Sequence, residues 1–326
     1  MARYVLSDIE KNELAAVADE FLATHPVWTP LEWADDIRAE AERLPVGIRR
    51  FLVSSRAAED AVILLGNLPV DEALVPTPPS WEVAEKEAAA IREELVLLLV
   101  GSVLGEPFGW VNQQDGRLVH DVCPSKGQEN SLTSASSRQQ LTLHTEDVFH
   151  SCRGDYVALM CLRNPEAVGT TVALVESVDF PEPTRRVLHQ DRFRFFPDDS
   201  HQVVPEHSAE NPSALADRPH EVASVLFGPE EAPYLRIDAD FTDAVPGDTE
   251  ADTALREAAG LLAAAAERVV LSPGDAVFID NHRAVHGRDT FTPRYDGTDR
   301  WLKRTSLVRD LRRTYVRTKS RSRLLG

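Results

Sequence analysis

The chain has 326 residues, 43% of them hydrophobic and 27% charged, an ordinary composition for a globular protein with a sizeable core. Its formal net charge of -18 argues against broad binding to nucleic acid or to an anionic membrane. The longest apolar run, Leu95 to Leu104, is too short to cross a bilayer, and the N-terminus lacks the apolar core of a secretory signal.

The first third of the chain, residues 1–108, is predicted to be mainly helical. Ser7 and Glu10 have the spacing of a capping box and precede an amphipathic pattern. The further elements predicted here are a helix from Trp33 to Leu44, a short buried strand from Ala61 to Gly66, and the longest helix from Trp81 to Leu104.

Short apolar or alternating runs, broken by Gly, Pro, Asn and Asp, fill residues 109–308. The predicted strands are Trp110 to Gln113, Leu118 to Val122, Tyr156 to Leu162, Thr171 to Val175, Tyr234 to Ile237, Ala276 to Ile279 and Thr305 to Val308. An alanine-rich helix is predicted over Asp252 to Val269. Many short strands after a helical opening indicate a mostly β fold, a sandwich or jelly roll with flanking helices.

Two long polar stretches, Ser125 to Gln140 and His207 to Glu221, are predicted as loops, and the first is a candidate lid over a reactive site. Residues 309–326 form a basic tail, which could bind a polyanion but which we expect to be solvated or frayed. No linker separates these parts, so one domain is expected over residues 1–326. Cys123, Cys152 and Cys161 lack paired spacing, which argues against disulfides or structural zinc and favours a reduced cytoplasm.

A pair of metal ligands is predicted where a short strand runs into a polar turn. Leu141 to Leu143 have strand character, and residues two apart in a strand share a face, so His144 and Glu146 are expected to point together. The third ligand is predicted to be His286, which ends an apolar strand, turn and second strand. Two imidazoles and one carboxylate leave a face of the metal open, as in non-haem Fe(II) oxygenases.

Other histidines compete for these places. His150 also flanks Glu146, but it lies beyond the turn, so strand direction favours His144. His282 and His286 are four residues apart and would suit zinc on a helix, but apolar strand residues precede them. The remaining candidates lie in turns or polar loops and are expected at the surface or behind the ligands: His25, His189, His201, His207 and His220.

Together, His144-x-Glu146, His286 and the segment Arg300 to Arg304 resemble the Fe(II)/2-oxoglutarate-dependent oxygenases of the clavaminate synthase-like group. Within that group, the resemblance is greatest to hydroxylases of free arginine from peptide-antibiotic pathways, and it covers roughly residues 109–308. It implies a double-stranded β-helix, or jelly roll, with Fe(II) held by the three ligands, 2-oxoglutarate chelating the iron, and O2 as oxidant.

The resemblance also implies roles for side chains around the metal. Arg300 would pair with the far carboxylate of 2-oxoglutarate, and Thr171 would touch the same carboxylate unless it is an ordinary strand threonine. Arg304, on the same strand face as Arg300, would take the α-carboxylate of an amino acid. Glu146 would also contact the amine of that amino acid.

The acidic pair Asp238 and Asp240 would grip a guanidinium, although two solvated acids at the start of a turn are the alternative. Gln113, Leu132 and Ser134 would also line the amino-acid pocket by the same resemblance. The implied activity is hydroxylation of free L-arginine at C3.

Several alternatives remain open on the sequence alone. The substrate could be lysine, citrulline or asparagine, and the outcome could be C4 hydroxylation or desaturation. Two alternatives are not enzymes. The protein could be a sensor that binds 2-oxoglutarate or an amino acid, or it could be a structural zinc protein. The oligomeric state is not predicted.

Overall fold

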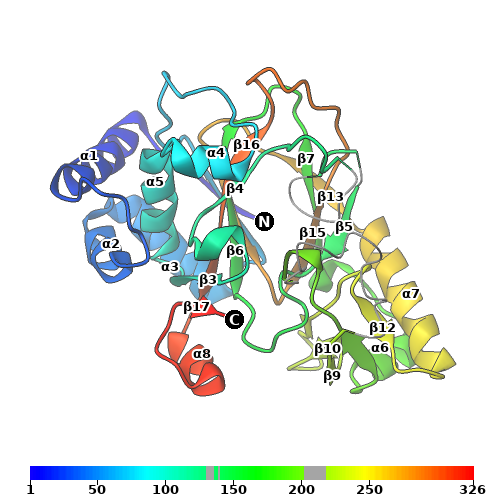
Figure 1. Cartoon of the computed structure of the whole chain (residues 1–326). Helices are drawn as coiled ribbons and strands as arrows, with labels where there is room; N and C mark the ends of the chain where they lie inside the picture. The colour runs from blue at the N-terminus through cyan, green and yellow to red at the C-terminus, as the bar shows by residue number, and fades with distance from the viewer. Residues whose placement is uncertain (130–135, 139, 202–217) are drawn as a thin grey trace.

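Two β-sheets with a shared core organise the molecule. The computed structural model describes residues 1–129, 136–138, 140–201 and 218–326 (Figure 1). In this part the larger sheet has eight strands, in the order β1 (Ala2–Val5), β2 (Val62–Gly66), β14 (Ala276–Asp280), β6 (Tyr156–Arg163), β16 (Trp301–Val308), β3 (Glu106–Trp110) and β17 (Leu324–Leu325), with β4 (His120–Val122) also paired to β16. The smaller sheet has the order β13 (Glu267–Val270), β7 (Gly169–Leu174), β15 (Ala284–Arg288) and β5 (Leu141–His144).

Alternate residues of one strand enter different cores. In β6, Val157 and Leu159 pack between the two sheets, whereas Ala158 and Met160 face the helices. Strand side chains alternate between faces, so a strand covered on both sides becomes an almost continuous apolar run. This arrangement confirms the predicted jelly-roll core with helices outside it.

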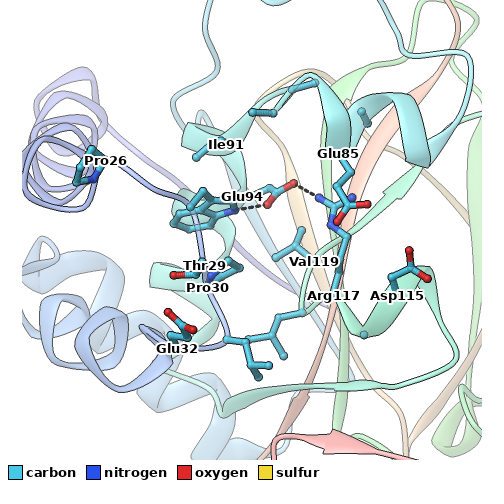
Figure 2. Close-up of a pocket in the computed structure, with 17 residues that line it drawn as sticks. Pro26, Thr29, Pro30, Glu32, Glu85, Ile91, Glu94, Asp115, Arg117 and Val119 are labelled. Carbon is cyan, nitrogen blue, oxygen red and sulfur yellow. Dashed lines mark hydrogen bonds and ion pairs between the residues drawn. The ribbon is translucent and has the colours of Figure 1, made fainter.

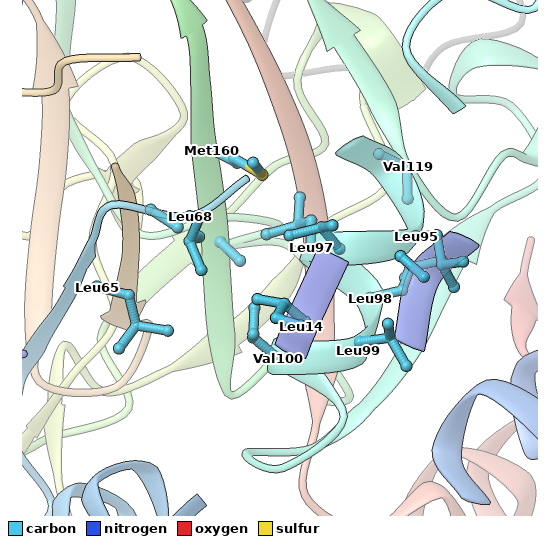
Figure 3. Packing of buried hydrophobic residues seen from close by; sticks show 14 of the residues in the cluster. Leu14, Leu65, Leu68, Leu95, Leu97, Leu98, Leu99, Val100, Val119 and Met160 are labelled. Atoms are coloured by element: carbon cyan, nitrogen blue, oxygen red, sulfur yellow. The ribbon is translucent and has the colours of Figure 1, made fainter. Parts of the chain in front are cut away.

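The N-terminal helices cover the outer face of the larger sheet (Figure 1). They are α1 (Asp8–Thr24), α2 (Ala34–Glu40), α3 (Val46–Ala58), α4 (Trp81–Lys86) and α5 (Ile91–Gly101), with the 3-10 turn η1 (Ala41–Arg43) after α2. Leu97 and Val100 of α5 share one buried cluster with Leu14 of α1 and Met160 of β6 (Figure 3). The predicted capping box of Ser7 and Glu10 is present at the start of α1.

Two predictions for the helical part were wrong or incomplete. The single long helix expected from Trp81 to Leu104 is divided into α4 and α5, because Ala88 and Ala90 adopt left-handed conformations with φ of 50° and 59°. Helix α3 and strand β1 were not predicted. The signal for α3 was present, since its buried Ile48 and Leu52 are four residues apart, as on one face of a helix.

A second group of elements packs on the outer face of the smaller sheet. It contains α6 (Glu182–Leu188), α7 (Thr249–Ala264), β8 (Phe193–Phe195), β9 (Glu221–Ala223), β10 (Leu226–Phe227), β11 (Tyr234–Leu235), β12 (Thr242–Ala244) and the turns η3 (Val175–Ser177) and η4 (Asp199–His201). The helix predicted over Asp252 to Val269 starts earlier, because Asp248 caps it. It ends earlier too, because Glu267 to Val270 pair with β7 as β13.

A further difference concerns the position of one predicted strand. The strand predicted at Trp110 to Gln113 lies earlier, as β3, and the 3-10 turn η2 (Gln114–Gly116) follows it. The predicted loops fall partly outside the described residues, at 130–135, 139 and 202–217. Among the described residues, no helix combines the length and the apolar character needed to cross a bilayer.

The basic tail is not frayed, contrary to expectation. It folds into α8 (Leu311–Thr318) and then β17, which pairs with β3. Arg323 forms ion pairs with Glu106 at 3.0 Å and Asp35 at 2.6 Å, and Arg313 pairs with Asp155 at 3.0 Å. These acids are distant in the sequence, so the run of basic residues alone did not reveal them.

Candidate metal centre

The three predicted ligands meet between the two sheets. In the pairing of β5 with β15, His144 lies directly opposite His286, and opposed residues project from one face of a sheet. Glu146 follows two residues after His144 in the turn. One ligand atom from each residue lies within 4.8 Å of the others, and Oε1 of Glu146 is 3.5 Å from Nε2 of His286 and 4.0 Å from Nε2 of His144.

The protonation of this group fits a divalent metal. Nδ1 of His144 is 2.8 Å from the carbonyl of Thr142, so Nδ1 carries a hydrogen and Nε2 is the nitrogen left for a metal. Burial, followed by the neighbouring His144, lowers the pKa of His286, which favours a neutral ligand. Burial alone would raise the pKa of Glu146, but Arg304 and the imidazoles hold it well below its usual range, so the acid is ionised.

The pKa of His144 has a different balance. Burial lowers it, but the Glu146 and Asp238 carboxylates outweigh burial and leave the pKa raised. The raised pKa favours a second proton on His144 in the metal-free protein. A bound cation would replace this proton, since a metal ligand must be deprotonated. A structural zinc site takes four protein ligands, whereas the described residues bring three together here. Two nitrogens and one carboxylate with an open face fit Fe(II).

Two neighbouring residues position the ligands. Asn281, in the turn between β14 and β15, accepts from the N–H of Glu146 at 2.7 Å and donates to its carbonyl at 3.0 Å. Gly287 lets β5 approach β15, because a Cβ at that position would lie 2.5 Å from the carbonyl oxygen of Leu141. Neither role was predicted from the sequence.

The competing histidines lie elsewhere. Nδ1 of His150 accepts from the N–H of Cys152 at 3.1 Å. Nε2 of His282 is 3.1 Å from Asp155, and burial together with Arg153 lowers the pKa of His282 to about 4. Neither residue belongs to the group of three.

On one side of the metal centre lies a base-rich cavity. It is lined by the three residues Thr170, Arg288 and Arg300, together with apolar side chains and the metal ligands Glu146 and His286. Arg300 is 6% exposed, its Nη2 is 3.4 Å from the hydroxyl of Thr170, and its Nε has no hydrogen-bond partner among the described residues. Burial lowers the pKa of Arg300 to about 10. A buried guanidinium with so few partners favours an anionic ligand.

The threonine beside Arg300 is Thr170 and not Thr171, a correction to the expected position. In the pairing of β7 with β15, Thr170 lies opposite Arg288, and Thr171 lies opposite Gly287. The side chain of Thr171 therefore leaves the other face of the sheet, where it lines a separate cavity with α7.

On the other side of the metal centre lies an acid-rich cavity. Its lining includes the carboxylates of Asp198, Asp238 and Asp240, with Ser200 and Phe241. Asp238 reaches this place because it bridges to His144 beside β5. Burial raises the pKa of Asp238 to about 6.

Asp238 and Asp240 both begin a turn and line the cavity. One oxygen of Asp238, Oδ1, accepts from the N–H groups of Asp240 at 2.7 Å and Phe241 at 3.1 Å, which leaves Oδ2 for a ligand. Oδ2 of Asp240 accepts from the hydroxyl of Thr142 at 2.6 Å. The turn of the alternative interpretation is present, but Asp238 is buried, so the pair is not two solvated acids.

Arg304, Glu146 and Leu141 line both cavities, so the acid-rich and base-rich cavities meet at the metal centre. Nη1 of Arg304 is 3.3 Å from Oε1 of Glu146, and Nη2 is 2.9 Å from Nδ1 of His120.

The other expected pocket residues have different outcomes. Nε2 of Gln113 lies 2.8 Å from the hydroxyl of Ser200, so Gln113 stands behind a cavity-lining residue. Leu132 and Ser134 lie outside the described residues. Sequence reasoning missed Thr170, Arg288, Asp198, Ser200, Asn281 and His120. Strand alternation from His286 could have found Arg288, but nothing local marked the others.

Comparisons with known proteins agree with this geometry. A family model described as taurine catabolism dioxygenase TauD, TfdA family, matches residues 85–306. The chain is 41% identical to enduracididine beta-hydroxylase from Streptomyces hygroscopicus, with 95% of each chain covered. It is 38% identical to L-ornithine/L-arginine 3-hydroxylase from Catenulispora acidiphila, with 92% of this chain and 95% of the relative covered. A crystal structure of the non-heme iron oxygenase OrfP with Fe, succinate and (3S)-hydroxy-L-Arg matches with a TM-score of 0.88, at 36% identity over 100% of both chains.

Proposed function

The chain belongs to the TauD/TfdA family of dioxygenases, and on that premise we propose that it hydroxylates free L-arginine at C3. The co-substrates are 2-oxoglutarate and O2, and Fe(II) is the metal held by His144, Glu146 and His286. The observation that carries the proposal is the meeting of a base-rich and an acid-rich cavity at these three ligands.

The base-rich cavity suits a dicarboxylate that also binds the metal. Arg300 offers a buried guanidinium, and Thr170 offers a hydroxyl beside it. A guanidinium is always charged and can hold a carboxylate through two parallel hydrogen bonds. Fe(II) held by His144, Glu146 and His286 would supply the oxidising chemistry. One oxygen atom of O2 enters the substrate, while 2-oxoglutarate becomes succinate and CO2.

The acid-rich cavity suits a cationic amino acid. Asp238 and Asp240, with Asp198 nearby, match the several N–H donors of a planar guanidinium. Arg304 lies between these acids and the base-rich cavity, where it can pair with the α-carboxylate. Charges at both ends fix the substrate along its length, and this orientation determines which carbon faces the metal.

The relatives support oxidation at C3, the beta carbon of an amino acid. The names of both hydroxylases specify that carbon, and the OrfP structure contains arginine hydroxylated there. The same names make ornithine and enduracididine the strongest alternative substrates to arginine.

We also propose a cytoplasmic location and a single domain over residues 1–326. The three cysteines are free and buried, which is compatible with a reducing compartment. Helix α5 packs against strands β6 and β16, so the helical part and the strand-rich part share one core.

The test is to incubate the protein with Fe(II), 2-oxoglutarate, O2 and one free amino acid at a time. The panel contains arginine, ornithine, enduracididine, lysine, citrulline and asparagine, with oxygen-free reactions as the control. A gain of one oxygen in the product mass, matched by succinate, indicates hydroxylation, and a loss of two hydrogens indicates desaturation. Turnover of asparagine but not of any cationic amino acid would contradict the substrate assignment. Ligand binding without succinate in any reaction would favour the sensor.

A further inference from the structure

We infer that His120 positions the guanidinium of Arg304 and thereby selects substrates with a free α-carboxylate. This inference rests on the proposed function only in that Arg304 receives the carboxylate of an amino acid. His120 has no place in the metal centre itself.

The sheet fixes the contact between the two residues. Strands β4 and β16 are antiparallel, and His120 lies directly opposite Arg304, so both side chains leave the same face. Nη2 of Arg304 lies 2.9 Å from Nδ1 of His120. The imidazole is buried, with 6% of its residue surface exposed.

The other nitrogen of His120 determines its tautomer. Nε2 lies 3.1 Å from the backbone carbonyl oxygen of Arg117, which can only accept a hydrogen bond. Nε2 therefore carries the hydrogen, and Nδ1 keeps the lone pair that accepts from Arg304. Burial, followed by Arg304 and Arg117, lowers the pKa of His120 well below its ordinary value, so the ring is neutral.

The carbonyl of Arg117 is held in place by its own side chain. The guanidinium of Arg117 is paired with Glu94 at 2.7 Å and Asp121 at 3.0 Å, and Figure 2 shows the first pair in the wall of a neighbouring cavity. Glu94 also accepts from the indole N–H of Trp28 at 2.7 Å. These contacts anchor Arg117, whose carbonyl oxygen lies beside Nε2 of His120.

The loss of His120 would redirect Arg304. Its remaining partner among the described residues is Glu146, at 3.3 Å from Nη1. A guanidinium beside a carboxylate favours a bidentate pair, so Arg304 would turn both nitrogens toward this metal ligand. It would then be withdrawn from a substrate carboxylate. By holding Nη2, His120 keeps Arg304 from pairing fully with Glu146.

Two variants separate the two hydrogen bonds of His120. His120→Asn retains an acceptor near the position of Nδ1 but is too short to reach the carbonyl of Arg117. His120→Gln retains an N–H donor near the position of Nε2 but has no acceptor at the position of Nδ1, where Arg304 needs one. If His120→Gln fails to fold, His120→Ala also removes the acceptor.

The readout is KM for L-arginine and for L-argininamide, whose α-carboxylate is replaced by an amide. We expect His120→Gln to raise the KM for L-arginine by roughly 10- to 100-fold, because the lost bond is to a charged group. The KM for L-argininamide should change little, so the preference for the free acid should shrink. His120→Asn should keep most of that preference. The KM for 2-oxoglutarate should match the parent in all variants, because His120 contacts Arg304 and not Arg300.

An equal rise in KM for L-arginine and for L-argininamide in His120→Gln would overturn the inference. A larger loss of the preference for L-arginine in His120→Asn than in His120→Gln would also overturn it. The proposed function fails separately, if the parent does not hydroxylate L-arginine. The same comparison then uses the amino acid that the parent does hydroxylate and its α-amide, or their binding measured by calorimetry if there is no turnover.

Discussion

The side chain of Asn281 binds both backbone polar groups of Glu146, the N–H at 2.7 Å and the carbonyl at 3.0 Å. Asn281 is 1% exposed and also donates to the carbonyl of Gly154 at 3.0 Å. The turn that joins β14 of the larger sheet to β15 of the smaller sheet thus holds the backbone of Glu146, which belongs to a different part of the chain.

Replacing Asn281 by alanine should weaken iron binding by about 10- to 100-fold, the usual effect of removing a group that orients a ligand. The measurement is a titration of the metal-free protein with Fe(II) without oxygen. Asn164 offers a matched control, because it binds the N–H and carbonyl of Val168 in the same way, away from the metal centre. Asn164→Ala should lower stability but not iron affinity, and an equal loss of iron in both variants would contradict the prediction.

Alanine at His144 or His286 should abolish stoichiometric iron binding, because each removes one of three ligands. Alanine at His150 or His282 should leave the iron content near normal, since these side chains bond to other partners. Iron per chain, measured after anaerobic loading, tests both statements. Loss of iron in His150→Ala with retention in His144→Ala would reverse the assignment.

Replacing Arg300 by alanine should raise the 2-oxoglutarate concentration for half-maximal rate by about 30-fold or more, because truncating one partner of a desolvated charge pair costs about 2–5 kcal/mol. Iron binding should be unchanged. Arg268→Ala on β13 is a suitable control, since Arg268 is half exposed and pairs with Asp289 at 2.5 Å. An unchanged half-saturation in Arg300→Ala would transfer this role to Arg288 or Arg304.

Asp238→Asn and Asp240→Asn should each weaken arginine binding, because they keep the shape of the acid-rich cavity and remove one charge. The loss of arginine affinity should be larger for Asp238→Asn than for Asp240→Asn. Asp238 is the more buried of the two, and a substrate cation costs more to leave without a partner where water is excluded. The kcat/KM for citrulline, which is neutral, should fall less than the kcat/KM for arginine, or should rise, since specificity is a difference between two affinities. The check is kcat/KM for both amino acids in each variant. Parental activity on arginine in both variants would contradict the substrate assignment but not the metal assignment.

The stability of the protein should respond to pH through Asp280. Burial, with Asp155 adding to it, raises the pKa of Asp280 to about 7 from 3.8. The unfolded chain ionises this acid at lower pH than the folded one, so its stability contribution declines as pH rises from about 4 to 7. Asp280→Asn should therefore stabilise the protein by a few kcal/mol at pH 8 and by less at pH 5. Urea unfolding at the two pH values tests this, with the exposed Asp36→Asn as the control. An equal gain at both pH values would contradict it.

The strand pattern of the sequence predicted a sandwich or jelly roll, and strand geometry predicted three candidate metal ligands, which the structure brings together. The pairing of His144 with Glu146 depends on short-range geometry, because alternation along a strand places the two side chains together, and the strand-turn-strand pattern before His286 is also local. The capping box at Ser7 and Glu10 was predictable for the same reason.

The contacts between neighbouring strands at the cavities followed from the tertiary structure. Thr170 faces Arg300, and Thr171 does not, because the pairing register of β7 with β15 assigns their faces. The contact of His120 with Arg304 likewise depends on the register of β4 with β16. The tail became ordered because its arginines met acids far away in the chain, such as Glu106. Cross-strand hydrogen bonds and buried contacts between distant segments set these relationships, and no local pattern encodes them.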